Sequence, residues 1–119
     1  MNCPRFLSVV GLGALLLAAG AALAAGEFLA ELEDLSLPAG LTEQPGGMLF
    51  ESPTGRIVEA VATGNLGAAE VRAFYAATLP QLGWERLDDA AFRRDKEVLH
   101  IDIEDKKRPL SVHFSVVPQ

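Results

Sequence analysis

The chain has 119 residues, which suits one domain, and half of its residues are hydrophobic. Its formal net charge is −6. Non-specific binding to nucleic acid or to anionic membranes requires a basic surface, which an acidic chain lacks. We therefore expect no nucleic-acid partner.

The first 24 residues predict a cleavable secretory signal peptide. Arg5 is the only charged residue before Glu27, and an apolar run rich in leucine and alanine follows it. The run ends in Ala-Leu-Ala at positions 22–24, the small-residue pattern of a cleavage site. Cleavage leaves residues 25–119, one charge unit more negative, in the periplasm or outside the cell. The alternative is an uncleaved anchor, because the run approaches the ~20 residues that span a bilayer. Its alanine and glycine content favours cleavage, after which we expect no membrane contact.

Cys3, the only cysteine, lies inside the predicted signal peptide. A lipoprotein signal would place its cysteine directly after the apolar run, whereas Cys3 precedes the run. The mature chain then contains no thiol, although export would permit disulfides. We expect no disulfide, no cysteine-ligated metal and no thiol nucleophile, so the fold depends on packing alone.

Residues 25–47 are predicted to form a partly irregular lead-in segment. Four large apolar residues recur at helical spacing and predict one or two helical turns: Phe28, Leu29, Leu32 and Leu35. Prolines and glycines between positions 38 and 47 then interrupt regular structure. We expect the segment to lie over the domain, anchored by three leucines: Leu35, Leu37 and Leu41. A flexible linker is the alternative.

Residues 48–119 are predicted to form a single domain that begins with a hairpin. Strands over 48–51 and 56–62 flank Ser-Pro-Thr-Gly at 52–55, which suits a type I turn with a bulge. This register pairs Phe50 with Val58 and Met48 with Ala60. It places these four side chains on the uncharged face of the hairpin, which is the predicted core face.

A helix is predicted over residues 68–82. Gly67 is an acceptable N-cap, Glu70 supports the start, and Gly83 suits the end. The helix carries one apolar stripe at the spacing of a buried face: Val71, Phe74, Tyr75, Thr78, Leu79 and Leu82.

The remaining chain is predicted to form an antiparallel meander with strands over 84–87, 91–94, 97–104 and 109–117. Two-residue turns at 95–96 and 106–107 set Phe92 beside Leu99, and Leu99 opposite Phe114. Apolar residues then face apolar residues across both pairs, as a correct register requires. The predicted fold class is α+β, with a hairpin, one main helix on one sheet face, and a meander.

The same register places His100 opposite His113, and Asp102 opposite Ser111, on the non-core face. Two imidazoles and a carboxylate could bind zinc or copper or transfer protons, so His100, His113 and Asp102 are the candidate metal residues. Ser111, His113 and Asp102 also match a hydrolase triad in residue type, but a mid-strand serine lacks the sharp turn of a nucleophile. Polar residues on a solvated sheet face are the alternative explanation.

Tyr75 and Trp84 are the only tyrosine and tryptophan, and they flank the end of the predicted helix. They could line an aromatic ligand pocket between helix and sheet. The alternative is that they close the edge of the core with wet polar tips. No cofactor is predicted.

One block of the sequence resembles a group of small exported bacterial proteins of unknown function. The block runs from Gly55-Arg56-Ile57-Val58-Glu59-Ala60 to a helix with Phe74-Tyr75 and the ending Leu79-Pro80-Gln81-Leu82-Gly83-Trp84. The lead-in Pro38-Ala39-Gly40-Leu41 extends the resemblance, which covers most of residues 35–104. It implies relatedness within the bacterial envelope and no activity.

Folding explains nearly every prominent residue. The sequence therefore predicts a non-enzymatic exported accessory or binding domain of the bacterial cell envelope, with an envelope protein as its partner. The alternative is a small metal-binding or hydrolytic periplasmic protein that uses the His100/His113 pair.

Overall fold

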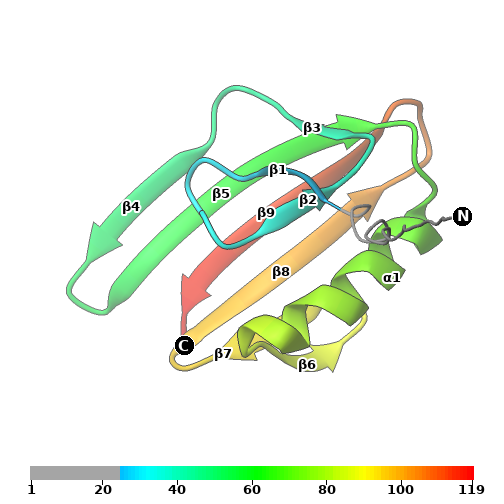
Figure 1. Cartoon of the computed structure of the whole chain (residues 1–119). Coiled ribbons are helices and arrows are strands. Elements are labelled where there is room, and N and C mark those ends of the chain that lie inside the picture. The colour runs from blue at the N-terminus through cyan, green and yellow to red at the C-terminus, as the bar shows by residue number, and fades with distance from the viewer. Residues whose placement is uncertain (1–24) are drawn as a thin grey trace, which may run out of the picture.

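The computed structural model describes residues 25–119. The predicted signal peptide at 1–24, with Cys3, lies outside the described residues. The described chain contains a seven-stranded antiparallel sheet, a two-stranded sheet and one helical segment (Figure 1). This arrangement confirms the α+β prediction. Within residues 25–119, no helix has the length and apolar character needed to cross a membrane.

The small sheet pairs β1 (Ala25–Phe28) with β2 (Ser36–Pro38). The large sheet has the order β3-β5-β9-β8-β7-β6, and β4 also pairs with β5. Its strands are β3 (Leu41–Glu43), β4 (Met48–Ser52), β5 (Gly55–Gly64), β6 (Glu85–Asp88), β7 (Ala91–Arg94), β8 (Glu97–Glu104) and β9 (Leu110–Pro118).

One face of the large sheet, the covered face, lies under the helix and under the β1–β2 hairpin (Figure 1). Its central side chains are apolar and buried: Val58, Ala60 and Ala62 on β5, and Val112, Phe114 and Val116 on β9. The opposite, open face alternates with it and carries Ile57, Glu59 and Val61 on β5, and Ser111, His113 and Ser115 on β9. In the described part of the chain, no helix or strand packs on the open face (Figure 1).

The predicted helix is present as α1 (Ala68–Thr78), continued by a 3-10 turn, η2 (Leu79–Leu82). The Glu70 carboxylate accepts a hydrogen bond from the Gly67 N–H at 3.1 Å, which supports the predicted start. Pro80 has no N–H and its ring would clash in a continued α-helix, so the last turn tightens. Gly83 ends it with φ 92°. The buried stripe stops at Leu79, and Leu82 is exposed.

The helical turns predicted for the lead-in segment are wrong. The chain instead forms β1, a turn over residues 30–34, and β2. The Leu29 N–H donates to the Leu35 carbonyl at 3.1 Å, and the Leu35 N–H donates to the Leu32 carbonyl at 3.0 Å. A tight strand-turn-strand wrap therefore points these leucines to one side, just as a helix would, and apolar spacing alone does not separate the two.

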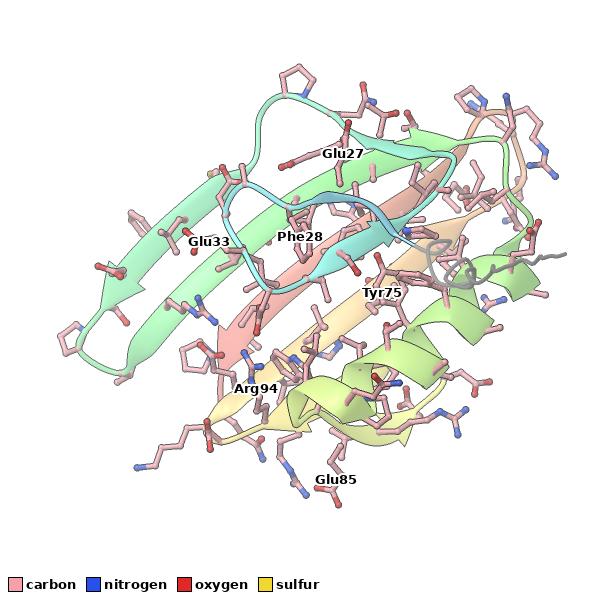
Figure 2. All side chains as sticks on the ribbon, viewed as in Figure 1. Glu27, Phe28, Glu33, Tyr75, Glu85 and Arg94 are labelled. Carbon is pink, nitrogen blue, oxygen red and sulfur yellow. The ribbon has the colours of Figure 1, made fainter. Side chains whose placement is uncertain are left out.

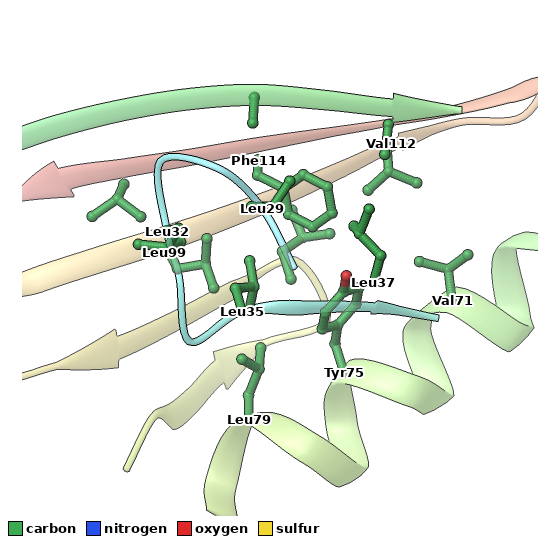
Figure 3. Packing of buried hydrophobic residues seen from close by; sticks show 14 of the residues in the cluster. Leu29, Leu32, Leu35, Leu37, Val71, Tyr75, Leu79, Leu99, Val112 and Phe114 are labelled. Carbon is green, nitrogen blue, oxygen red and sulfur yellow. The ribbon is translucent and has the colours of Figure 1, made fainter. Parts of the chain in front are cut away.

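The predicted anchoring of the lead-in segment is confirmed. Five of its leucines are at most 4% exposed: Leu29, Leu32, Leu35, Leu37 and Leu41. Figure 3 shows the first four of them between the helix residues Tyr75 and Leu79 and the sheet residue Phe114. The Tyr75 hydroxyl donates a 2.9 Å hydrogen bond to the Ser36 carbonyl and so fastens the lead-in segment to α1. β3 joins the large sheet, so residues 25–47 fold together with 48–119.

The predicted register of the first hairpin is wrong by one residue. A two-residue turn pairs Ser52 with Gly55, and Phe50 then lies opposite Ile57 instead of Val58. Because side chains alternate between faces, the slip moves Met48 and Phe50 from the predicted core face to the open face. The leucines of the lead-in segment fill the core in their place.

The predicted register of β8 and β9 is wrong by two residues, whereas that of β7 and β8 is confirmed. Phe92 lies beside Leu99 as predicted. Leu99 lies opposite Val116, and Ile101 opposite Phe114, because five residues connect β8 and β9 instead of two. Pro109 cannot donate to a ladder, and β9 begins after it. A two-residue slip preserves both faces, so apolar patterning does not detect it.

Burial of the lead-in segment has a measurable consequence. We expect Leu37→Ala to lower the free energy of unfolding of the chain by about 2–5 kcal/mol, because it leaves a cavity in the core. Urea denaturation followed by circular dichroism measures it. Leu87→Ala is the matched control, since Leu87 is 45% exposed and Leu37 is fully buried. Equal, small losses in the two variants would contradict the packing of the lead-in segment.

Candidate functional site

The three candidate metal residues lie on the open face, as predicted, but in a different arrangement. His113 lies opposite Asp102, and His100 lies opposite Ser115, so the predicted His100–His113 pair is diagonal. All three side chains are exposed. Among residues 25–119, no group of three or more His, Cys, Asp or Glu side chains is close enough to hold a metal ion. The register change therefore separates the two imidazoles that were predicted to face each other.

This arrangement predicts no metal response. We expect added zinc to leave the thermal unfolding midpoint of the chain unchanged, and the His100→Ala/His113→Ala variant to behave identically. A zinc site at a hundredfold excess over its Kd would add about 2.7 kcal/mol of stability. Differential scanning fluorimetry with and without zinc detects a shift of that size. A zinc-dependent rise that the double variant loses would establish the metal-binding alternative.

The two candidate aromatic residues are buried and do not share a pocket. Tyr75 is 2% exposed and lines a cavity of about 220 Å³ between α1 and strands β6 to β8, whose other lining residues are Arg72, Ala73, Ala76, Arg86, Asp89, Phe92 and Ile101. Trp84, also 2% exposed, lies away from this cavity, with the Arg94 guanidinium 4.3 Å from the centre of its ring. Asp34 accepts a 2.9 Å hydrogen bond from Arg94 and orients it. Trp84 and Arg94 thus close one end of the core.

Burial raises the pKa of the Tyr75 phenol well above its ordinary value, because the charged phenolate would be poorly solvated. The unfolded chain releases this proton near pH 10 and the folded chain retains it. The contribution of Tyr75 to stability is therefore present below about pH 10 and decreases as the pH rises beyond it.

Tyr75 is the only tyrosine, so its titration is directly visible. We expect no phenolate absorbance from the folded chain near pH 10 to 11, and its appearance together with unfolding at higher pH or in denaturant. Ultraviolet titration with parallel circular dichroism measures this. Tyr75→Phe is the control for the pH dependence of stability. Lysine side chains titrate in the same pH range in both chains, so the difference between the two stability curves reports Tyr75 alone. Phenolate absorbance in the folded state would contradict the burial of Tyr75.

The most unusual surface of the described chain is β4. Every residue of β4 is exposed, and three consecutive residues are large and apolar: Met48 at 55%, Leu49 at 48% and Phe50 at 66%. β4 pairs with β5 alone, so its outer edge has no strand beside it in the described residues. Unpaired backbone groups beside exposed apolar side chains form a template for another strand.

The apolar character of β4 continues across the open face. Phe50 on β4 lies opposite Ile57 on β5, and Val117 on β9 lies opposite Val98 on β8. Val58 on β5 pairs with Val116 on β9, so their chain neighbours Ile57 and Val117 also lie side by side. The side chains of Phe50, Ile57, Val117 and Val98 therefore form one row across four strands. The other three are half-buried, and Phe50 at the end of the row is the most exposed. We call these four residues with Met48 the apolar row.

On the covered face, β4 borders an acidic groove of about 370 Å³ lined by Glu31, Glu33, Asp34, Leu49, Arg56 and Arg94. Figure 2 shows Glu33 on the turn of the lead-in segment. The Arg56 guanidinium makes hydrogen bonds of 2.6 and 3.1 Å to Glu97, which raise the pKa of Arg56. Arg94 pairs with Asp34. Both cations of the groove are therefore already neutralised, and the charges of Glu31 and Glu33 remain.

The sequence predicts this hairpin and an edge strand over residues 48–51 that could pair with another chain. The predicted bulged turn, however, buries Met48 and Phe50, so the exposed apolar surface of β4 was not predicted. Two signals pointed to the observed arrangement. First, a two-residue turn between Ser52 and Gly55 places each β4 side chain on the face opposite to the one that the bulged turn predicts. Second, the consecutive run Met48-Leu49-Phe50 puts apolar side chains on both faces of the strand, whereas a half-buried strand has them on one face only.

Comparisons with protein-family models, with curated proteins and with solved structures each return no significant match. The resemblance to small exported bacterial proteins stays a prediction.

Proposed function

We propose that the chain is a non-enzymatic accessory or binding domain, exported to the bacterial cell envelope, that binds a partner protein along β4. The observation that carries this proposal is the unpaired edge of β4 with its three exposed apolar side chains. A strand of this kind gains most from a neighbour, which completes its hydrogen bonds and removes apolar surface from water.

The contrast with the opposite edge of the sheet supports the proposal. β6 carries an irregularity between Arg86 and Asp88, which disturbs further pairing. Glu85 forms a 2.9 Å ion pair with Arg93, and Arg86 pairs with Asp89. Charges and a bulge are the usual protection of a sheet edge against association. β6 has both features, whereas the stretch Met48–Phe50 of β4 contains no charged residue and pairs in a regular register.

The amino-terminal sequence supports the proposed location. A basic residue, an apolar run and an Ala-Leu-Ala end direct export with cleavage before Ala25. An exported, thiol-free chain has its stability from packing alone, and the buried leucine core supplies that packing.

Photocrosslinking in the bacterium that makes the protein tests the proposal. We expect a photoreactive amino acid at Phe50 to crosslink the exported chain to a specific protein, because the Phe50 side chain is exposed on the unpaired edge strand. The matched control is the same group at Leu87, which is exposed on the opposite edge. Mass spectrometry of the same sample should show a chain that begins at Ala25. Equal crosslinking from both positions, or a mass that begins at Met1 in the cell interior, would refute the proposal.

A further inference from the structure

We infer that the partner supplies an extended segment in which basic and apolar residues alternate, and that this segment pairs with β4 as an additional strand of the large sheet. This inference rests on the proposed function and specifies the chemistry of the partner. It follows from three features of β4: its backbone edge, the apolar row on one side, and the acidic groove on the other.

The backbone edge explains why the partner segment is extended. Every second residue of β4 directs its N–H and C=O away from β5, and in the described chain no strand receives them. An added strand gains affinity from main-chain hydrogen bonds and specificity from side chains that alternate between the two faces. Its two sets of side chains therefore meet two different surfaces of this protein.

On the open face the added strand meets Met48 and Phe50. These side chains are more than half exposed and continue into Ile57 on the neighbouring strand. Apolar partner residues on this side would cover them and extend the apolar row outward, since apolar cross-strand neighbours stabilise a sheet. Charged partner residues would lose hydration here without a counter-ion.

On the covered face the added strand meets Leu49 and the acidic groove. Glu31 closely approaches Gly47, the residue before β4, because a Cβ on Gly47 would lie 2.6 Å from Glu31 Oε1. This oxygen is buried without a hydrogen-bond partner in the described residues. Glu33 is exposed and takes part in none of the ion pairs found in that same part of the chain. A lysine or arginine from the partner would hydrogen-bond the exposed Glu33 carboxylate and would be attracted by the nearby charge of Glu31, and charge-assisted bonds are among the stronger ones.

The same charges argue against a second copy of this chain as the occupant. In an antiparallel β4–β4 pair, Glu51 of each copy projects on the covered face, where it would approach Glu31 and Glu33 of the other. Like charges in facing positions are destabilising, and the whole chain carries −6. A basic segment of a different protein satisfies the charges that a second copy would repel.

Synthetic strands test the inference directly. The probe is a fluorescent peptide of about seven residues, the length of a typical strand, in which lysine alternates with valine. The control peptide has glutamate in place of every lysine. We expect the lysine peptide to bind the exported chain in fluorescence anisotropy, with affinity that falls as salt rises, and the glutamate peptide not to bind.

Matched variants locate the binding. Leu49→Lys should weaken binding of the lysine peptide at least about tenfold, because the new ammonium occupies the acidic groove and repels the peptide. Leu87→Lys is the control, since Leu87 is similarly exposed, at 45% against 48%, on the opposite edge. Glu31→Gln/Glu33→Gln should weaken binding several-fold and flatten its salt dependence, whereas Glu104→Gln on the open face should not.

The outcomes separate this inference from the proposed function. Equal binding of the two peptides, no binding of the lysine peptide, or equal effects of the two leucine variants would overturn the inference. A dimer in analytical ultracentrifugation that Leu49→Lys dissociates would also overturn it, in favour of self-association. If crosslinking from Phe50 persists in any of these cases, the binding function stands and only the partner chemistry is wrong. If crosslinking is also lost, both fail.

Discussion

The structure depends on the burial of the lead-in leucines between the helix and the large sheet. One helix is too narrow to cover a seven-stranded sheet, and α1 lies over the β6–β8 side (Figure 1). Leu29, Leu32, Leu35 and Leu37 cover the β5–β9 side, and the hydrogen bond from Tyr75 to Ser36 joins the two coverings. At about 1.5–3 kcal/mol for each fully buried leucine, this segment contributes a large share of the core of a chain without disulfides.

The same constraint explains where the binding surface lies. The lead-in segment reaches across β5 and β9 but leaves β4 outside the core, so every residue of β4 is exposed. The turn of the lead-in segment also brings Glu31 and Glu33 to the inner side of β4, where Arg56 and Arg94 are already paired. Packing that completes the core thus creates both the uncovered edge and the acidic groove beside it.

Most elements were predictable because each had a local signal. Gly67, Glu70 and Gly83 mark the helix, and the alternation in residues 97–104 marks a strand with its inner and outer faces. The partner register of β8 and β9 had no such signal. A shift of two residues keeps every side chain on its face, so the predicted His100–His113 pair and the observed Asp102–His113 pair fit the sequence equally well. The distance between two imidazoles depends on register, and no periodicity reports it.

The sequence by itself predicted an export signal whose cleavage would leave a thiol-free chain, and it determined the α+β class, the helix and the polar residues of β8 and β9 on the open face. These properties depend on composition, on capping residues and on side-chain alternation, which act over a few neighbouring residues. The tertiary structure alone decided that the lead-in segment completes the core with strands instead of helical turns, that Met48 and Phe50 face solvent, and that Glu31 and Glu33 lie on the other face of the same strand. These properties depend on contacts between residues far apart in the chain, where competition for the same buried volume selects one register over another.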